Sequence, residues 1–321
     1  MTTVTDMRSS PRARAMRNVG FALLLGLTLA AFWAPLSALI RFSFQQEHYS
    51  HIIVIPLISA ALFFLERRRI FARVETCWSG GLALLLVGAL LYGFGRGQLA
   101  SASENDQLSL AILSGVVICV GSFVLCYGTR AFRRGLFPAL FLFLMVPVPD
   151  VLLGRVIAWL QIGSAEVSYA MFELAGVPIF RTGFVFALPG VTIEVGKECS
   201  GIRSGLVLLI MSLVGGHLFL RSAWAKVVLI LATLPLLIVK NGIRIVTLSL
   251  LSIYVDPGFL TGHLHRDGGI LFFLLALMLL APVLRWLQKS EQAADDNGRT
   301  SSAGHAVTED LPPRTKVRMR M

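Results

Sequence analysis

One cysteine in this sequence stands among polar residues at the start of an apolar run. Cys199 belongs to the segment VGKECSGIRSG, and the next residue, Ser200, is of a type that caps helix N-termini. Free backbone N–H groups and the positive end of a helix dipole favour a thiolate there, and Arg203 adds a positive charge one turn later. These features predict an activated nucleophile. Cys119 and Cys126 lie within an apolar stretch and fit a structural role instead.

Three polar residues interrupt a later apolar run, LLIVKNGIRIVTLSLL. Lys240 and Arg244 are one helical turn apart and share a face, with Asn241 beside them. A charge at the centre of a membrane helix costs about 2.5–3.5 kcal/mol even on insertion scales, so such residues are functional candidates by default. Counted from Lys226 at about 1.5 Å per residue, Arg244 lies about 27 Å across the bilayer, at the level expected for Cys199. Lys240 fits a structural anchor equally well.

The segment TGHLHRDGG supplies candidate acid–base groups just before the last apolar run. In an extended stretch, His263, His265 and Asp267 point to one side. A histidine near a thiol on the outer face is a natural general acid–base. The same side chains could also bind a metal, but no further ligand cluster is evident on that face. We therefore expect neither a metal nor another cofactor.

A second histidine-containing stretch, QQEHYSHIIVIPLIS, borders another apolar run. Its polar residues Glu47, His48 and His51 fit an interfacial cap better than a catalytic group. The four cysteines show no CxxC spacing, which argues against a disulfide framework and a zinc ribbon.

The composition indicates a membrane in which these residues must be positioned. The chain has 321 residues, of which 55% are hydrophobic and 15% charged, whereas soluble domains carry about 25% charged residues. Several runs reach the roughly 20 apolar residues that cross a bilayer. Lys and Arg cluster in short segments between those runs, so the net charge of +11 reports orientation and not a nucleic-acid partner. A soluble enzyme is excluded.

The apolar runs predict an all-α polytopic membrane protein with about eight spans. With a cytoplasmic N-terminus, the inner segments before the tail carry 13 Lys or Arg, and the longer outer segments carry 5. The positive-inside rule then puts both termini in the cytoplasm and Cys199 on the outer face, periplasmic or extracellular. We expect the membrane to be the cell (inner) membrane, with the active site on its periplasmic face. The expected spans are 19–40, 51–65, 80–96, 108–127, 135–149, 201–220, 225–251 and 268–287.

The rest of the chain divides around this membrane core. Within the long outer segment, GRVIAWLQIGSAEVSYAMFELAG has helical periodicity and predicts an interfacial helix. FVFALPGVTIEV alternates like a short hairpin around a Pro-Gly turn. We expect a basic cytoplasmic leader (1–18), a catalytic membrane domain (19–287) and a disordered cytoplasmic tail (288–321).

Together these motifs resemble the exosortase branch of the exosortase/archaeosortase family of membrane transpeptidases. The matching stretches are YSHIIVIPLIS, VPVPD, ECSGIRS, NGIRI and HLHRDGG, and they span about 40–287. The resemblance implies a cysteine, an arginine and a third basic residue at an extracytoplasmic site, here Cys199, Arg244 and His265. His265 matches better than His263 because a glycine, Gly269, follows it four residues later; the doubled histidine keeps both open.

The resemblance also implies a reaction. Cys199 would attack a backbone carbonyl to form a thioester, with Arg244 stabilising the oxyanion and Arg203 in support. His265 would protonate the leaving amine and then activate the acceptor. Ser200 and Asn241 would assist. The implied substrates are secreted proteins with a C-terminal Pro-Glu-Pro-type motif, an apolar span and a basic end; the other implied partners are membrane lipid and an acceptor that is a polysaccharide or a lipid.

Two other classes fit parts of the pattern. A transporter would use Lys240 and Arg244 inside a span to bind an anion, but it would not need Cys199, and the chain shows no inverted repeat. A zinc-dependent membrane hydrolase would use the histidines of TGHLHRDGG and would lose activity with a chelator.

Overall fold

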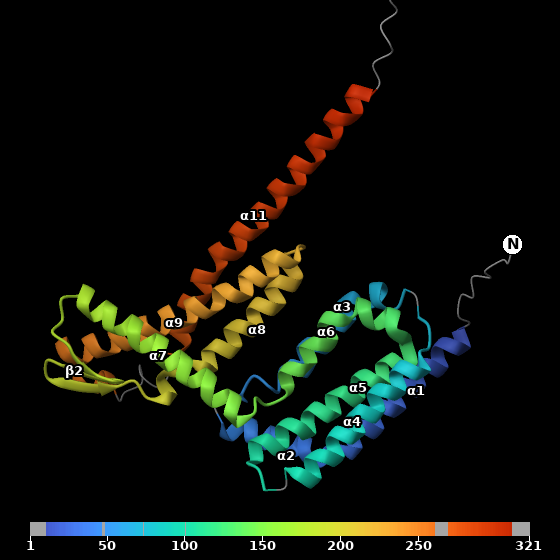
Figure 1. Cartoon of the computed structure of the whole chain (residues 1–321), viewed down its shortest axis with the longest axis horizontal. Helices are drawn as coiled ribbons and strands as arrows, with labels where there is room; N and C mark the ends of the chain where they lie inside the picture. Colours follow the sequence, from blue (N-terminus) through green and yellow to red (C-terminus); the bar gives the residue numbers. More distant parts are fainter. Residues whose placement is uncertain (1–10, 47–48, 73, 100, 261–268, 310–321) are drawn as a thin grey trace, which may run out of the picture. The chain divides into compact units, whose positions relative to one another are not determined.

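Helices dominate the structure, a computed structural model, and they confirm the predicted all-α polytopic membrane fold (Figure 1). The side chains of Glu198, Cys199, Leu260 and residues 295–309 are not described. The residues that the structure describes are 11–46, 49–72, 74–99, 101–260 and 269–309.

Among the described residues, six helices are long and apolar enough to cross a membrane. A seventh crossing arises if two helices bent by 66° at Phe32, α1 and α2, form one span. Pro35 lies in the first turn of α2 and has no N–H to donate, which favours the break. The six are α4 (Trp78–Gln98), α5 (Glu104–Arg134), α7 (Asp150–Leu174), α8 (Ile202–Phe219), α9 (Ala223–Tyr254) and α11 (Gly269–Glu309, with the candidate span Gly269–Ala294); the bent pair is α1 (Pro11–Ala31) and α2 (Trp33–Gln45).

The expected number of about eight included two stretches that form shorter helices. Segment 51–65 becomes α3 (Ile55–Ile70), of 16 residues. Segment 135–149 becomes α6 (Leu136–Phe141) and the 3-10 helix η2 (Leu142–Met145). The helix ends there because each valine of VPVPD precedes a proline, and a residue before proline disfavours helical backbone.

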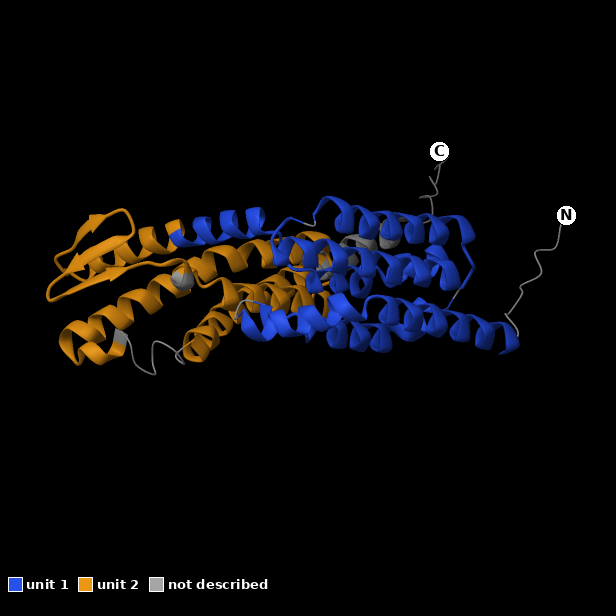
Figure 2. Ribbon diagram, turned by 90° about the horizontal axis from the view of Figure 1, so that it is seen from below, with its two compact units in different colours: residues 1–161 blue, residues 162–321 orange. Residues whose placement is uncertain are grey.

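The chain divides into two compact units, Met1–Gln161 and Ile162–Met321, coloured separately in Figure 2. In the first, α4 and α5 pack closely because Gly81 leaves no room for a side chain: a Cβ there would lie 2.5 Å from Leu125 Cα. Small residues permit such close helix contacts in membranes. Helix α1 packs against α5 through Phe21, whose ring contacts Phe123 and Tyr127.

The second unit contains the predicted hairpin. Strands β2 (Val185–Leu188) and β3 (Val191–Glu194) pair antiparallel around Pro189-Gly190, and Gly190 has a φ of +79° as a type II turn requires. A third strand that was not predicted, β1 (Phe180–Thr182), pairs with β2. The sheet is anchored by an apolar cluster in which Phe172 of α7 and Val246 of α9 pack with Phe186, Leu188 and Val195.

Three helices complete this unit. Gly205 of α8 faces α9 so closely that a Cβ would lie 2.5 Å from Leu237 Cδ2. Helix α11 packs on both through a cluster that includes Leu208, Leu229 and Ala276. Its helix continues to Glu309, past position 287 where the catalytic domain was expected to end; the domain division itself stays a prediction. The interfacial placement of α7 also stays a prediction, because this helix has the length and composition of a membrane span as well.

Candidate active site

The backbone of Cys199 lies in a short connection between the sheet and α8. This connection is the 3-10 helix η3 (Lys197–Ser200), followed by Gly201 in the left-handed conformation with a φ of +73°. Gly201, and not Ser200 as expected, is the N-cap of α8. Ser200 is instead fully buried, and its Oγ has no hydrogen-bond partner within the described part of the chain.

Helix α9 brings the polar residues of its span to this connection. Lys240 and Asn241 are buried, with 2% and 0% exposure, and Arg244 one turn on is half-buried. A Cβ on Gly201 would lie 3.1 Å from Asn241 Oδ1, so the connection rests directly on this face of α9. Lys240 Nζ donates to Ser204 Oγ at 2.6 Å, in the first turn of α8.

The C-terminal half of α7 packs against the same part of α9. Asn241 Nδ2 donates to Ser164 Oγ at 2.9 Å. One residue later, Gly242 permits close approach, because a Cβ there would lie 2.6 Å from Val167 Cγ1. Three separate segments, α7, the η3–α8 connection and α9, therefore meet around Lys240 and Asn241.

The structure brings two of the predicted site residues to one place and puts another at the surface. Ser200 and Asn241 both lie at the Gly201 connection, whereas Arg203 is exposed on the first turn of α8. His263, His265 and Asp267, like Glu47 and His48, lie outside the described residues.

Sequence reasoning missed two serines that complete this cluster, Ser164 and Ser204. Ser164 and Ser168 are four residues apart and thus on one face of α7, a spacing that could have marked a polar stripe. Ser204 stands inside the ECSGIRS motif, but nothing in its spacing from Lys240 indicates a contact. No group of three or more His, Cys, Asp or Glu suited to a metal occurs within the described ranges, which exclude 261–268.

Comparison with known families bears on the chemistry of this cluster. The sequence model of the transmembrane exosortase family matches residues 33–282, which contain every segment of the cluster. The chain belongs to the transmembrane exosortase family. No curated protein and no solved structure matches it significantly. Membership makes this exosortase a multi-pass membrane protein of a family of cysteine-type transpeptidases that process sorting signals.

This exosortase has a second polar cluster, in its first unit, around the VPVPD motif. Asn105 Nδ2 donates to Val148 O at 2.8 Å and to Asp150 Oδ1 at 2.7 Å, and Tyr49 O–H donates to Val148 O at 3.1 Å. The Asp150 N–H donates to Asp106 Oδ1 at 2.8 Å. Tyr49 belongs to YSHIIVIPLIS, so two of the stretches that carry the family resemblance meet here.

The environment of Tyr49 keeps its hydroxyl protonated. Burial raises the pKa of Tyr49 to about 12, and the nearby Asp150 carboxylate adds to the increase. The phenol therefore remains a hydrogen-bond donor to the Val148 carbonyl at physiological pH.

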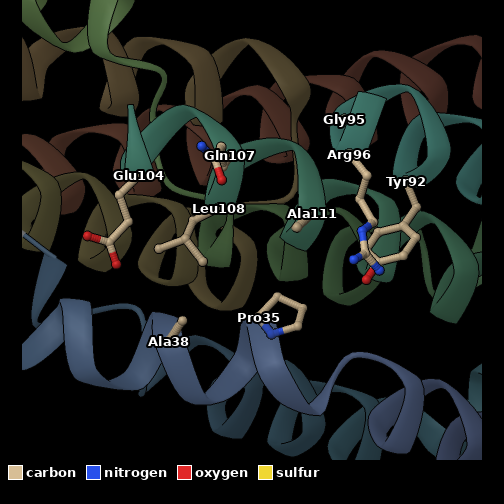
Figure 3. Close-up of a pocket in the computed structure, with 9 residues that line it drawn as sticks. All are labelled: Pro35, Ala38, Tyr92, Gly95, Arg96, Glu104, Gln107, Leu108 and Ala111. Carbon is tan, nitrogen blue, oxygen red and sulfur yellow. The ribbon is translucent and has the colours of Figure 1, made fainter. Parts of the chain in front are cut away.

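A cavity of about 420 Å³ lies in the first unit of this exosortase between α2, α4 and α5 (Figure 3). Pro35, Ala38, Leu108 and Ala111 give it apolar walls. Polar groups lie at its ends, with Glu104 in the first turn of α5 and Arg96 in the last turn of α4. None of the predicted catalytic residues lines it.

Proposed function

We propose that this exosortase is a cysteine transpeptidase that cleaves Pro-Glu-Pro-type C-terminal sorting signals of secreted proteins. The cleaved protein would be held as a thioester and passed to an acceptor, a polysaccharide or a lipid. One observation carries the proposal: the buried polar face of α9, with Lys240 and Asn241, lies against Gly201, two residues after Cys199. A membrane helix holds such residues at a cost, so their position beside the cysteine motif supports a functional role.

The proposed reaction has two steps, formation of the thioester and its transfer to the acceptor. The Cys199 thiolate attacks the scissile carbonyl carbon, the C–N bond breaks, and the leaving amine takes a proton from His265. The acceptor then loses its proton to His265 and attacks the thioester, which breaks the C–S bond and regenerates the thiolate. In both tetrahedral intermediates the negative oxygen would bind Arg244, with Arg203 in support.

The test of this mechanism is to trap the thioester. The full-length protein in proteoliposomes is mixed with a tagged substrate that carries a Pro-Glu-Pro motif, an apolar span and a basic end. We expect a covalent adduct that survives SDS without reductant and is released by neutral hydroxylamine. Cys77→Ala should form it and Cys199→Ala should not. An adduct in Cys199→Ala, or processing that a chelator abolishes, would contradict the proposal.

The outward orientation of the site is tested separately. We propose that the protein spans the inner membrane with both termini in the cytoplasm, because basic residues concentrate in the segments assigned to that side. In single-cysteine variants, an impermeant maleimide should label Cys199 in spheroplasts, whereas Cys77 should react only after permeabilisation. The reverse pattern would overturn the topology.

A further inference from the structure

Lys240 is a buried charge to which the proposed reaction gives no task. Lys240 is only 2% exposed, and it lies on a helix with the length and apolarity of a membrane span. An anchor of the membrane position would extend toward the interface and its water. Lys240 instead reaches across to another helix, where its Nζ lies 2.6 Å from Ser204 Oγ.

The contact with Ser204 continues to the backbone beside the nucleophile. Ser204 Oγ donates to the Gly201 carbonyl at 3.0 Å, and the Gly205 N–H donates to the same carbonyl at 2.9 Å. A hydroxyl that accepts a hydrogen bond from an ammonium group becomes a stronger donor, because the two bonds polarise each other. The Lys240 ammonium group therefore strengthens the hydrogen bond from Ser204 Oγ to the Gly201 carbonyl.

Gly201 is the point at which the direction of the connection is decided. Its left-handed backbone, with a φ of +73°, turns the chain from η3 into α8. Its carbonyl is held from the α8 side by Ser204 and Gly205, and its Cα is backed by Asn241. A fixed Gly201 peptide therefore restrains the position of the Cys199 backbone, two residues earlier.

From this geometry we infer that Lys240 is a positioning residue that acts through Ser204 to hold the Gly201 turn and thereby the Cys199 backbone. The inference rests on the proposed function for its consequence, which is a faster chemical step. It deepens that function, since it assigns Lys240 to the nucleophile and not to substrate binding.

The variants that test this follow from the hydrogen bonds. Lys240→Met keeps the length and removes the charge, and an apolar residue suits a buried helix position, so folding should survive. Ser204→Ala removes the link, whereas Ser204→Thr keeps a hydroxyl. Ser212→Ala is the matched control, since Ser212 is a buried serine of the same helix whose Oγ donates to Leu208 O, one turn earlier in α8.

The expected kinetics separate positioning from other roles. Lys240→Met and Ser204→Ala should each lower kcat about tenfold with little change in KM, because a displaced nucleophile slows chemistry more than binding. The double variant should be no slower than the slower of the two single variants, because both substitutions interrupt the same series of contacts from Lys240 through Ser204 to Gly201. Ser204→Thr and Ser212→Ala should process substrate at nearly the parental rate.

Three kinetic results would overturn the inference: an unchanged kcat in Lys240→Met, a loss that appears only in KM, or additive losses in the double variant. Hydrogen exchange of residues 197–205 adds a readout independent of turnover. Faster exchange there in Lys240→Met is expected, and unchanged exchange would also overturn it. If Cys199→Ala still processed substrate while Lys240→Met loosened this segment, the proposed function would fail and the structural link would stand.

Discussion

The two polar clusters of this exosortase are built differently. Around VPVPD, the side chains of Tyr49 and Asn105 both donate to the Val148 carbonyl, in the proline-containing run between η2 and α7. Around Gly201, Lys240 and Asn241 bond serine side chains of two other helices and place a buried charge where the backbone does not require one. The VPVPD cluster supplies hydrogen bonds to the backbone, whereas the Gly201 cluster holds a buried charge that no backbone group requires. Changes in the VPVPD cluster should therefore alter stability, and changes in the Gly201 cluster should alter turnover.

The largest expected effect is that of Cys199→Ser, two residues before Gly201. A serine hydroxyl is barely ionised without a strong base, so substrate processing should fall by at least about 1,000-fold. Insertion and abundance, followed by immunoblot of membranes, should match the parent. Parental processing by this variant would remove the nucleophile from the mechanism.

Arg244→Lys should follow closely. An oxyanion partner must present a planar group with several donors, and lysine is a poor substitute. Loss of one such donor lowers the rate by about 100- to 1,000-fold, a larger effect than that of any substitution at Lys240. Processing of a tagged substrate is compared with Arg155→Lys, an exposed arginine of α7, which should behave like the parent. If Arg244→Lys kept full activity, Arg244 would be an anchor for the span.

Asn105→Ala tests the polar cluster around VPVPD. It deletes a hydrogen bond to the half-buried Val148 carbonyl and one to the exposed Asp150 carboxylate, so we expect a loss of about 2 kcal/mol of stability. Thermal unfolding in detergent measures this, with Gln107→Ala, an exposed side chain of the same helix, as control. Turnover per folded molecule should remain parental. A selective loss of turnover would erase the distinction between the clusters.

Tyr49→Phe should have the smallest effect, about 1 kcal/mol for one hydrogen bond. Because the pKa of Tyr49 is raised to about 12 from an ordinary value of 10.0, its contribution is complete below pH 10 and is lost as pH rises toward 12. The stability difference between Tyr49→Phe and the parent should therefore be constant from pH 7 to 9 and change sharply only above about pH 10. A difference that varied between pH 7 and 9 would show that another group governs this cluster.

The sequence by itself determined the features that depend on local pattern. Apolar run lengths established the membrane class, and the alternation around Pro189-Gly190 predicted the hairpin that the structure contains. Lys240, Asn241 and Arg244 stood out because charged and polar groups are expensive within an apolar helix wherever it packs. Motif spacing was enough to indicate the family, which the match over 33–282 confirmed.

Only the tertiary structure decided which of these residues meet. Lys240 bonds Ser204 across 36 residues of chain, and Asn241 bonds Ser164 across 77, at distances set by how the helices pack. The periodicity of each helix defines its faces but not which face meets a neighbour, so neither serine could be assigned from the sequence. The same reason moved the N-cap of α8 from Ser200 to Gly201: the connection turns where α9 supports it, and that support comes from a helix that the local sequence does not contain.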